Sequence, residues 1–178
     1  MSKIETVARF LQRHGLRLAT AESCTAGLIA SRVAEVPGCG DTLHCAVVAY
    51  SPDAKENILS VPAELIRRHG LTSEPVSLAM ARGVLGLSGA NVAIANTGLA
   101  DGGAGDDGTP PGTQCFAWVF RLPGQRDAAF TETRRFDGDR NAVREAAAEW
   151  ALERVCHYHE LARRGESETV ADASGGKR

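Results

Sequence analysis

The sequence predicts an α/β fold, a three-layer α/β/α sandwich around a mixed sheet of about five strands. Short apolar segments alternate with helical ones through most of the chain, a pattern typical of parallel strands covered on both faces. Further along, two strand-like segments flank Pro123-Gly124, which predicts a hairpin and one antiparallel strand. The length of 178 residues fits one domain with its own core.

Cap and stop residues place the helices. A Ser-x-x-Glu capping box at Ser2 begins the first helix, and Gly15 ends it. Pro37-Gly38 stops the second, and Ser73-Glu-Pro75 opens a later one. An amphipathic pattern near the C-terminus predicts one long helix. After the first, helices are expected over 25–35, 60–70, 73–87 and 139–163.

Apolar runs place the strands, which are expected over 16–21, 42–50, 91–96, 113–120 and 128–136. The runs at 42–50 and 91–96 indicate buried strands. Between the third and fourth strands the chain is dense in Gly, Asp and Pro, and long loops of this kind are usually functional or disordered. We expect one domain over 1–164 and a disordered tail over 165–178, because the last residues are small and polar.

The composition argues against several classes of function. The net charge of -2 gives no basic surplus for nucleic acid, and no apolar run reaches the roughly 20 residues of a membrane span. Five scattered cysteines and no secretory signal favour a reducing, cytoplasmic location. His157 and His159 point to different faces of a helix, so no metal is expected. No dinucleotide fingerprint is present, and no cofactor is expected.

Lys55 is the first candidate for chemistry. The chain has 20 Lys and Arg residues, of which only Lys3, Lys55 and Lys177 are lysines, two of them near the ends. Unlike a guanidinium group, a buried amine loses its proton readily. A lone interior lysine in an Arg-rich chain is therefore either a general base or a surviving surface lysine, and the count alone does not decide between them.

Ser23 is the second candidate. It sits where the first predicted strand turns into a helix, and ligands of open α/β sheets bind at the carboxyl ends of strands. Helix N-terminal amides beside it are expected to hold an oxyanion or a phosphate. The alternative for Ser23 is a simple helix cap. If the strands before Ser23 and Lys55 are parallel, both residues lie at one edge, and Lys55 can take the Ser23 proton.

Other polar residues near these positions each have two interpretations. Tyr50 is a hydrogen-bonding partner or a packed aromatic, and Cys24 is a rival nucleophile or, more in keeping with its position, a small buried residue. The amides of Thr97-Gly98 complete an oxyanion hole or make a plain turn. Arg140 and Arg144, one helical turn apart, clamp a phosphate or are solvated.

Taken together these motifs resemble the C-terminal domain family of CinA, the nicotinamide-mononucleotide deamidases, from about residue 3 to residue 160. The resemblance rests on an ordered set of short motifs: Ala21-Glu-Ser-Cys-Thr-Ala-Gly27, Val48-Ala-Tyr-Ser51 with Lys55, Ser73-Glu74, Met80-Ala-Arg-Gly83, Thr97-Gly98, Gly108-Thr-Pro-Pro-Gly-Thr113 and Phe136 with Gly138-Asp-Arg140.

The resemblance implies a Ser-Lys amidohydrolase that cleaves the carboxamide of nicotinamide mononucleotide to nicotinate mononucleotide and ammonia. By position, Ser23 is the implied nucleophile, Lys55 the base, and Tyr50 and Thr97 polar partners. Cys24, Thr25, Gly98, Arg140 and Arg144 are the expected substrate-binding residues. A stand-alone domain that forms a homodimer or larger homo-oligomer is also expected.

The chain departs from the family pattern in three places, one of which is the unusual Pro52 after Ser51. Ala26 stands where a Gly is usual, and Asp101 puts a negative charge in a loop expected to hold an anionic substrate. Asp101 is therefore expected to oppose binding. Two alternative functions remain at this point: a catalytically silent module that binds a nucleotide or a partner protein, and an amidase for another carboxamide.

Overall fold

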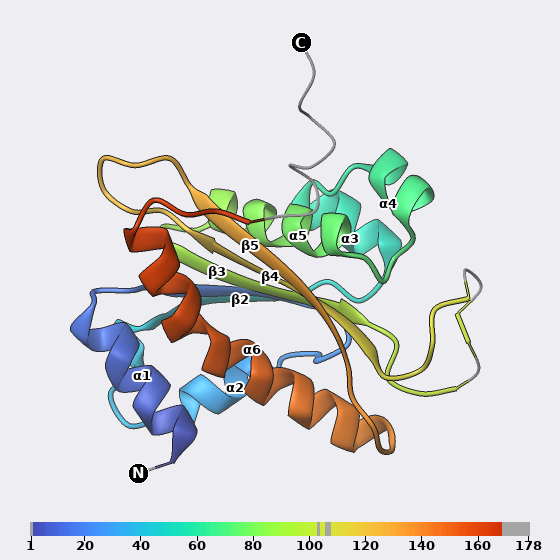
Figure 1. The fold of residues 1–178 in the computed structure, drawn as a ribbon, viewed down its shortest axis with the longest axis horizontal. Coiled ribbons are helices and arrows are strands. Elements are labelled where there is room, and N and C mark those ends of the chain that lie inside the picture. The colour runs from blue at the N-terminus through green and yellow to red at the C-terminus, as the bar shows by residue number, and fades with distance from the viewer. Residues whose placement is uncertain (1, 103, 106–107, 169–178) are drawn as a thin grey trace.

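The computed structural model describes residues 2–102, 104–105 and 108–168 as a five-stranded sheet between two helical layers (Figure 1). The strands are β1 Leu18–Glu22, β2 Leu43–Val48, β3 Val92–Gly98, β4 Thr113–Phe120 and β5 Ala128–Arg135. The helices are α1 Lys3–Arg13, α2 Leu28–Ala34, α3 Pro52–Leu59, α4 Ala63–His69, α5 Glu74–Leu87 and α6 Arg140–Arg163, with a short 3-10 turn over Cys39–Asp41.

The strand order is β2-β1-β3-β4-β5, and only β4 runs against its neighbours. Helices α1, α2 and α6 cover one face, while α3, α4 and α5 cover the other (Figure 1). This arrangement confirms the predicted three-layer sandwich, the hairpin and the single antiparallel strand. Because β1, β2 and β3 are parallel, the segments after all three strands open at one edge of the sheet.

The two faces of the sheet have different cores. Large side chains fill the α6 side, where Phe116 and Trp118 stack with ring centroids 5.7 Å apart and the Trp118 Nε1 donates to the Ala151 carbonyl at 2.8 Å. The α5 side is lined mainly by alanines and small aliphatic residues. There Gly83 lies against the Leu59 carbonyl so closely that no Cβ would fit. This contact fixes α5 beside the end of α3.

Some expected elements differ from the structure. Strand β2 is not buried: it is the edge strand, with alternate residues exposed. A helix missed in the sequence, α3, begins at Pro52 and is capped by the Ser51 Oγ, which accepts from the Ala54 N–H. Helix α2 begins only at Leu28, after a turn.

The C-terminal segment also differs from the expected disordered tail. Glu168 lies beside β5, where its N–H donates to the Ala129 carbonyl at 2.9 Å and its carbonyl accepts from the Thr131 N–H at 3.2 Å. The remainder of the expected tail, 169–178, lies outside the described residues.

Candidate active site

Ser23 and Lys55 meet at the carboxyl edge of the parallel strands. The Lys55 Nζ lies 2.9 Å from the Ser23 Oγ, although the two residues are 32 positions apart. Ser23 directly follows β1, and helix α3 carries Lys55 back over the sheet edge. Lys55 is 1% exposed and Ser23 7% exposed. The sequence expectation that these two residues share one edge therefore agrees with the structure.

Two backbone carbonyls hold the Lys55 amine in place. Its Nζ donates to the Ala49 carbonyl at 2.9 Å and to the Tyr50 carbonyl at 3.1 Å. Burial lowers the pKa of Lys55 to about 8, because desolvation penalises the ammonium form. A neutral amine has two N–H bonds and one lone pair. With both N–H bonds directed to carbonyls, the lone pair is left for the Ser23 hydroxyl.

A cavity of about 450 Å³ opens beside this pair. Ser23, Cys24, Tyr50, Thr97 and Gly98 all line it, together with Lys55, residues 70–72, Gly105 and Thr109. Within the described part of the chain, no cluster of three or more His, Cys, Asp or Glu side chains is placed to hold a metal ion.

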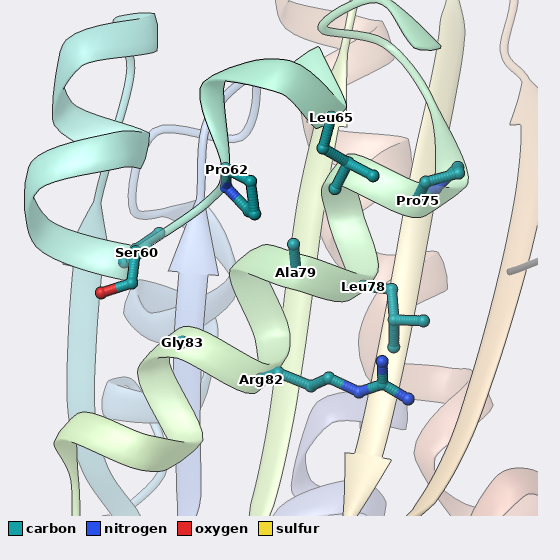
Figure 2. Close-up of a pocket in the computed structure, with 9 residues that line it drawn as sticks. Ser60, Pro62, Leu65, Pro75, Leu78, Ala79, Arg82 and Gly83 are labelled. Carbon is teal, nitrogen blue, oxygen red and sulfur yellow. The ribbon is translucent and has the colours of Figure 1, made fainter. Parts of the chain in front are cut away.

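A second hollow, of about 400 Å³, lies between α5 and the connection from α3 to α4 (Figure 2). Its walls are Pro, Leu and Ala side chains, with the Arg82 side chain at one end. Arg82 is the one ionisable residue among those that line it, so this hollow holds no pair of nucleophile and base. We therefore place the candidate active site in the first cavity.

The turn that carries Ser23 is built on a buried carboxylate, which the sequence analysis missed. Glu22 is fully buried, and its Oε2 accepts from the Thr25 hydroxyl and the Gly27 N–H at 2.8 Å and from the Ile29 N–H at 3.1 Å. Its Oε1 accepts from the Ala30 N–H at 3.0 Å. Glu22 thus takes the N-terminal amides of α2, and the expectation that these amides hold an oxyanion or phosphate is wrong.

Side chains of two neighbouring strands support the same turn. The Asn96 Oδ1 accepts from the Thr25 N–H at 3.1 Å, and its Nδ2 donates to the Gln114 Oε1 at 3.0 Å. The Gln114 Nε2 in turn donates to the Cys24 Sγ at 3.3 Å. Gly98 contacts Gln114 so closely that a side chain at this position would displace it. Asn96 and Gln114 could have been identified from the sequence, because each is a polar residue within an otherwise apolar strand.

The expected substrate-binding residues do not all face the cavity. Thr25 is fully buried with its hydroxyl on Glu22, and it does not line the cavity. The Thr97 hydroxyl donates to the Leu71 carbonyl at 2.8 Å rather than to Ser23. Burial raises the pKa of the Cys24 thiol, against the opposing effect of the bond from Gln114, which disfavours the thiolate needed for a nucleophile.

Arg140 and Arg144 are separated by the structure and do not form one clamp. The Arg144 Nε donates to the Cys24 carbonyl at 3.0 Å, and its Nη2 donates to the Thr25 carbonyl at 3.1 Å, so Arg144 braces the turn. The Arg140 Nη1 instead contacts the Asp101 Oδ1 at 2.6 Å, and its Nη2 donates to the Tyr50 hydroxyl at 2.8 Å.

The site has two parts, the floor and the rim. The floor is the Ser23 turn, residues 23–27, with the four side chains that hold it: Glu22, Asn96, Gln114 and Arg144. The rim is an exposed set of three residues: Tyr50, which lines the cavity, and Arg140 and Asp101, which do not line it but are joined to it through the Tyr50 hydroxyl.

Comparisons with known proteins agree with this fold. A sequence model of the CinA C-terminal domain matches residues 1–159. A putative competence-damage inducible protein of Symbiobacterium thermophilum is 43% identical over 161 residues, covering 86% of this chain and 37% of that relative. A CinA-like protein of Mycolicibacterium paratuberculosis is 44% identical over 148 residues, covering 83% of this chain and 34% of the relative. The chain thus spans about a third of the length of these relatives.

Solved structures give the same result. A CinA superfamily protein of Klebsiella pneumoniae is 38% identical with a TM-score of 0.81, covering 90% of this chain and 96% of the other. A CinA superfamily protein of Escherichia coli is 34% identical with a TM-score of 0.80, covering 86% and 87%. By its sequence and its fold, this chain belongs to the CinA C-terminal domain family.

Proposed function

We propose that this protein is an amidohydrolase that converts nicotinamide mononucleotide to nicotinate mononucleotide and ammonia through Ser23 and Lys55. The observation that carries the proposal is the buried Lys55 amine, held by two carbonyls with its third contact on the Ser23 Oγ. This is the arrangement that a general base needs to activate a serine nucleophile.

In the proposed first step, the Ser23 Oγ attacks the carboxamide carbon while its proton moves to the Lys55 Nζ. The amide nitrogen of the tetrahedral intermediate then takes this proton from the Lys55 ammonium group, the C–N bond breaks and ammonia leaves. In the second step Lys55 accepts a proton from water, and the resulting hydroxide cleaves the acyl-enzyme ester. Ser23 recovers its proton as nicotinate mononucleotide leaves.

We assign the oxyanion contacts to the backbone N–H groups of Cys24 and Gly98. Cys24 directly follows the nucleophile, and within the described residues no acceptor contacts its N–H. The Leu99 N–H donates to the Thr113 carbonyl of β4, so the alternation along a strand directs the Gly98 N–H the opposite way, toward Ser23. Two such donors in a dry site are the usual means of stabilising a tetrahedral oxyanion.

Release of ammonia from nicotinamide mononucleotide by the purified protein tests the proposal. Ser23→Ala should abolish turnover, whereas Cys24→Ala should retain most of it and mainly affect packing. A thiol-alkylating reagent should likewise leave the enzyme largely active. Turnover by Ser23→Ala together with an inactive Cys24→Ala would show that Cys24, and not Ser23, is the nucleophile. The absence of ammonia release from the wild-type protein would overturn the proposed function.

No helix within the described residues is long and apolar enough to cross a membrane. A cytoplasmic location and a homodimer or larger homo-oligomer remain predictions.

A further inference from the structure

The rim joins the exposed loop after β3 to the catalytic pair through a chain of contacts. Arg140 is the first residue of α6 and holds Asp101 with one guanidinium nitrogen and the Tyr50 hydroxyl with another. The Tyr50 carbonyl accepts from the Lys55 Nζ. Arg140 therefore contacts the side chain of a residue whose backbone carbonyl accepts from the proposed base.

Asp101 neutralises Arg140 in this arrangement. Neither residue lines the cavity, but Arg140 is bonded to Tyr50, which does, and the Asp101 and Arg140 side chains are 48% and 49% exposed. A ligand that extends past Tyr50 therefore contacts both. Any phosphate that binds Arg140 meets a guanidinium group that already has an anionic partner. Among the described residues that line the cavity, Lys55 is the one cationic side chain, and burial favours its neutral form.

We propose that Asp101 is a specificity-determining residue. Its carboxylate pairs with Arg140 and lowers the preference of the site for phosphorylated over unphosphorylated carboxamides. This inference rests on the proposed function for the nature of its ligands. A phosphate bound to Arg140 lies close to the Asp101 carboxylate. Repulsion between one carboxylate and one or two phosphate charges a few ångströms away in water corresponds to about a five- to thirtyfold change in affinity.

The test compares two ligands that differ only in the phosphate, nicotinamide mononucleotide and its ribonucleoside. Equilibrium binding is measured in a Ser23→Ala background, so that neither ligand is consumed. Asp101→Asn removes the charge but keeps an oxygen that accepts from Arg140, so Tyr50 stays in place. We expect it to raise the ratio of mononucleotide to nucleoside affinity about five- to thirtyfold. The gain should shrink at high salt, because the charges are exposed.

Asp127→Asn is the matched control. Asp127 is also an exposed carboxylate paired with an arginine, Arg121, but the Arg121 side chain has no hydrogen bond to Tyr50. Its removal should leave the ratio unchanged. A ratio that stays constant in Asp101→Asn, or that changes equally in Asp101→Asn and Asp127→Asn, would overturn the inference.

Ammonia release by the wild-type protein separates this inference from the proposed function. A shifted ratio without ammonia release would overturn the amidase and leave the role of Asp101 standing. Ammonia release with an unshifted ratio would overturn the role of Asp101 alone. If neither ligand binds to any variant, both are wrong.

Discussion

The floor and the rim of the cavity are held by different kinds of interaction. On the floor, buried side chains from β1, β3 and β4 and the half-buried Arg144 of α6 meet the polar groups of one short turn, and Glu22 alone accepts four hydrogen bonds. On the rim, Tyr50 is 55% exposed, and Asp101 and Arg140 are about half exposed. Buried polar networks are costly to break, whereas exposed ion pairs contribute little to stability. The floor should therefore govern catalysis and stability, and the rim should govern the choice of ligand.

The largest effect should come from Lys55 itself. Lys55→Arg keeps a positive charge but cannot accept a proton, so kcat/KM for ammonia release should fall by roughly 10²–10⁴ or more. A Lys55→Gln variant checks the result in case the larger guanidinium disturbs folding. Near-full activity in a folded Lys55→Arg protein would exclude the Ser-Lys mechanism.

The same base predicts a pH profile. Burial lowers the pKa of Lys55 to about 8, and the reaction requires the unprotonated amine, so kcat/KM should rise with pH up to about 8 and then level off. Wild-type rates measured across this range give the inflection directly. A profile that is flat through this range would argue against Lys55 as the base.

Glu22→Gln should be the most damaging change among the side chains that hold the floor. The amide N–H₂ would face one of the N–H groups that now donates to the carboxylate, and a buried unsatisfied group costs about 1–3 kcal/mol. Thermal unfolding should shift down by several degrees, and kcat should fall because Ser23 moves. The control is Glu35→Gln. Glu35 is an exposed carboxylate at the C-terminal end of α2, the helix whose N–H groups donate to Glu22. Equal effects of the two substitutions would show that the buried Glu22 carboxylate contributes no more than an exposed carboxylate, and would contradict its role in holding the floor.

The two arginines of α6 offer a sharper comparison. Arg140→Ala should raise KM for the mononucleotide about ten- to a hundredfold, the cost of one lost charge-assisted contact to phosphate. Arg144→Ala should instead lower kcat and the unfolding temperature, because two carbonyls of the Ser23 turn lose their donors. Steady-state kinetics and thermal melts of both variants separate the roles. The reverse pattern would mean that Arg144 contacts the ligand.

The smallest effect concerns the turn backbone. Ala26 has a φ of 50°, in the left-handed region that favours glycine. Ala26→Gly should stabilise the protein by up to about 1 kcal/mol, which corresponds to roughly 2–4 °C in the unfolding temperature. A loss of stability would show that the Ala26 methyl contributes more by packing than the backbone strain costs.

Much of the fold followed from local patterns. The capping box at Ser2, the hairpin at Pro123-Gly124 and the long C-terminal helix all appear where they were expected. Helix α3 was missed although Ser51-Pro52 is a cap followed by a proline in the first turn, because eight residues are too few for a clear apolar period. The edge position of β2 was not predictable, since an apolar run does not say which strand lies outermost.

The sequence by itself determined the α/β class, the family resemblance and the two residues that carry the proposed chemistry. An unusual lysine and a serine at a strand end are features of composition and order. Only the tertiary structure decided what surrounds them. Glu22 under the turn, Arg144 on its carbonyls and Asp101 on Arg140 are contacts between side-chain atoms, and Arg144 lies 120 positions from Cys24. These contacts depend on how the helical layers pack against the sheet, and the spacing of residues along the sequence does not determine that packing.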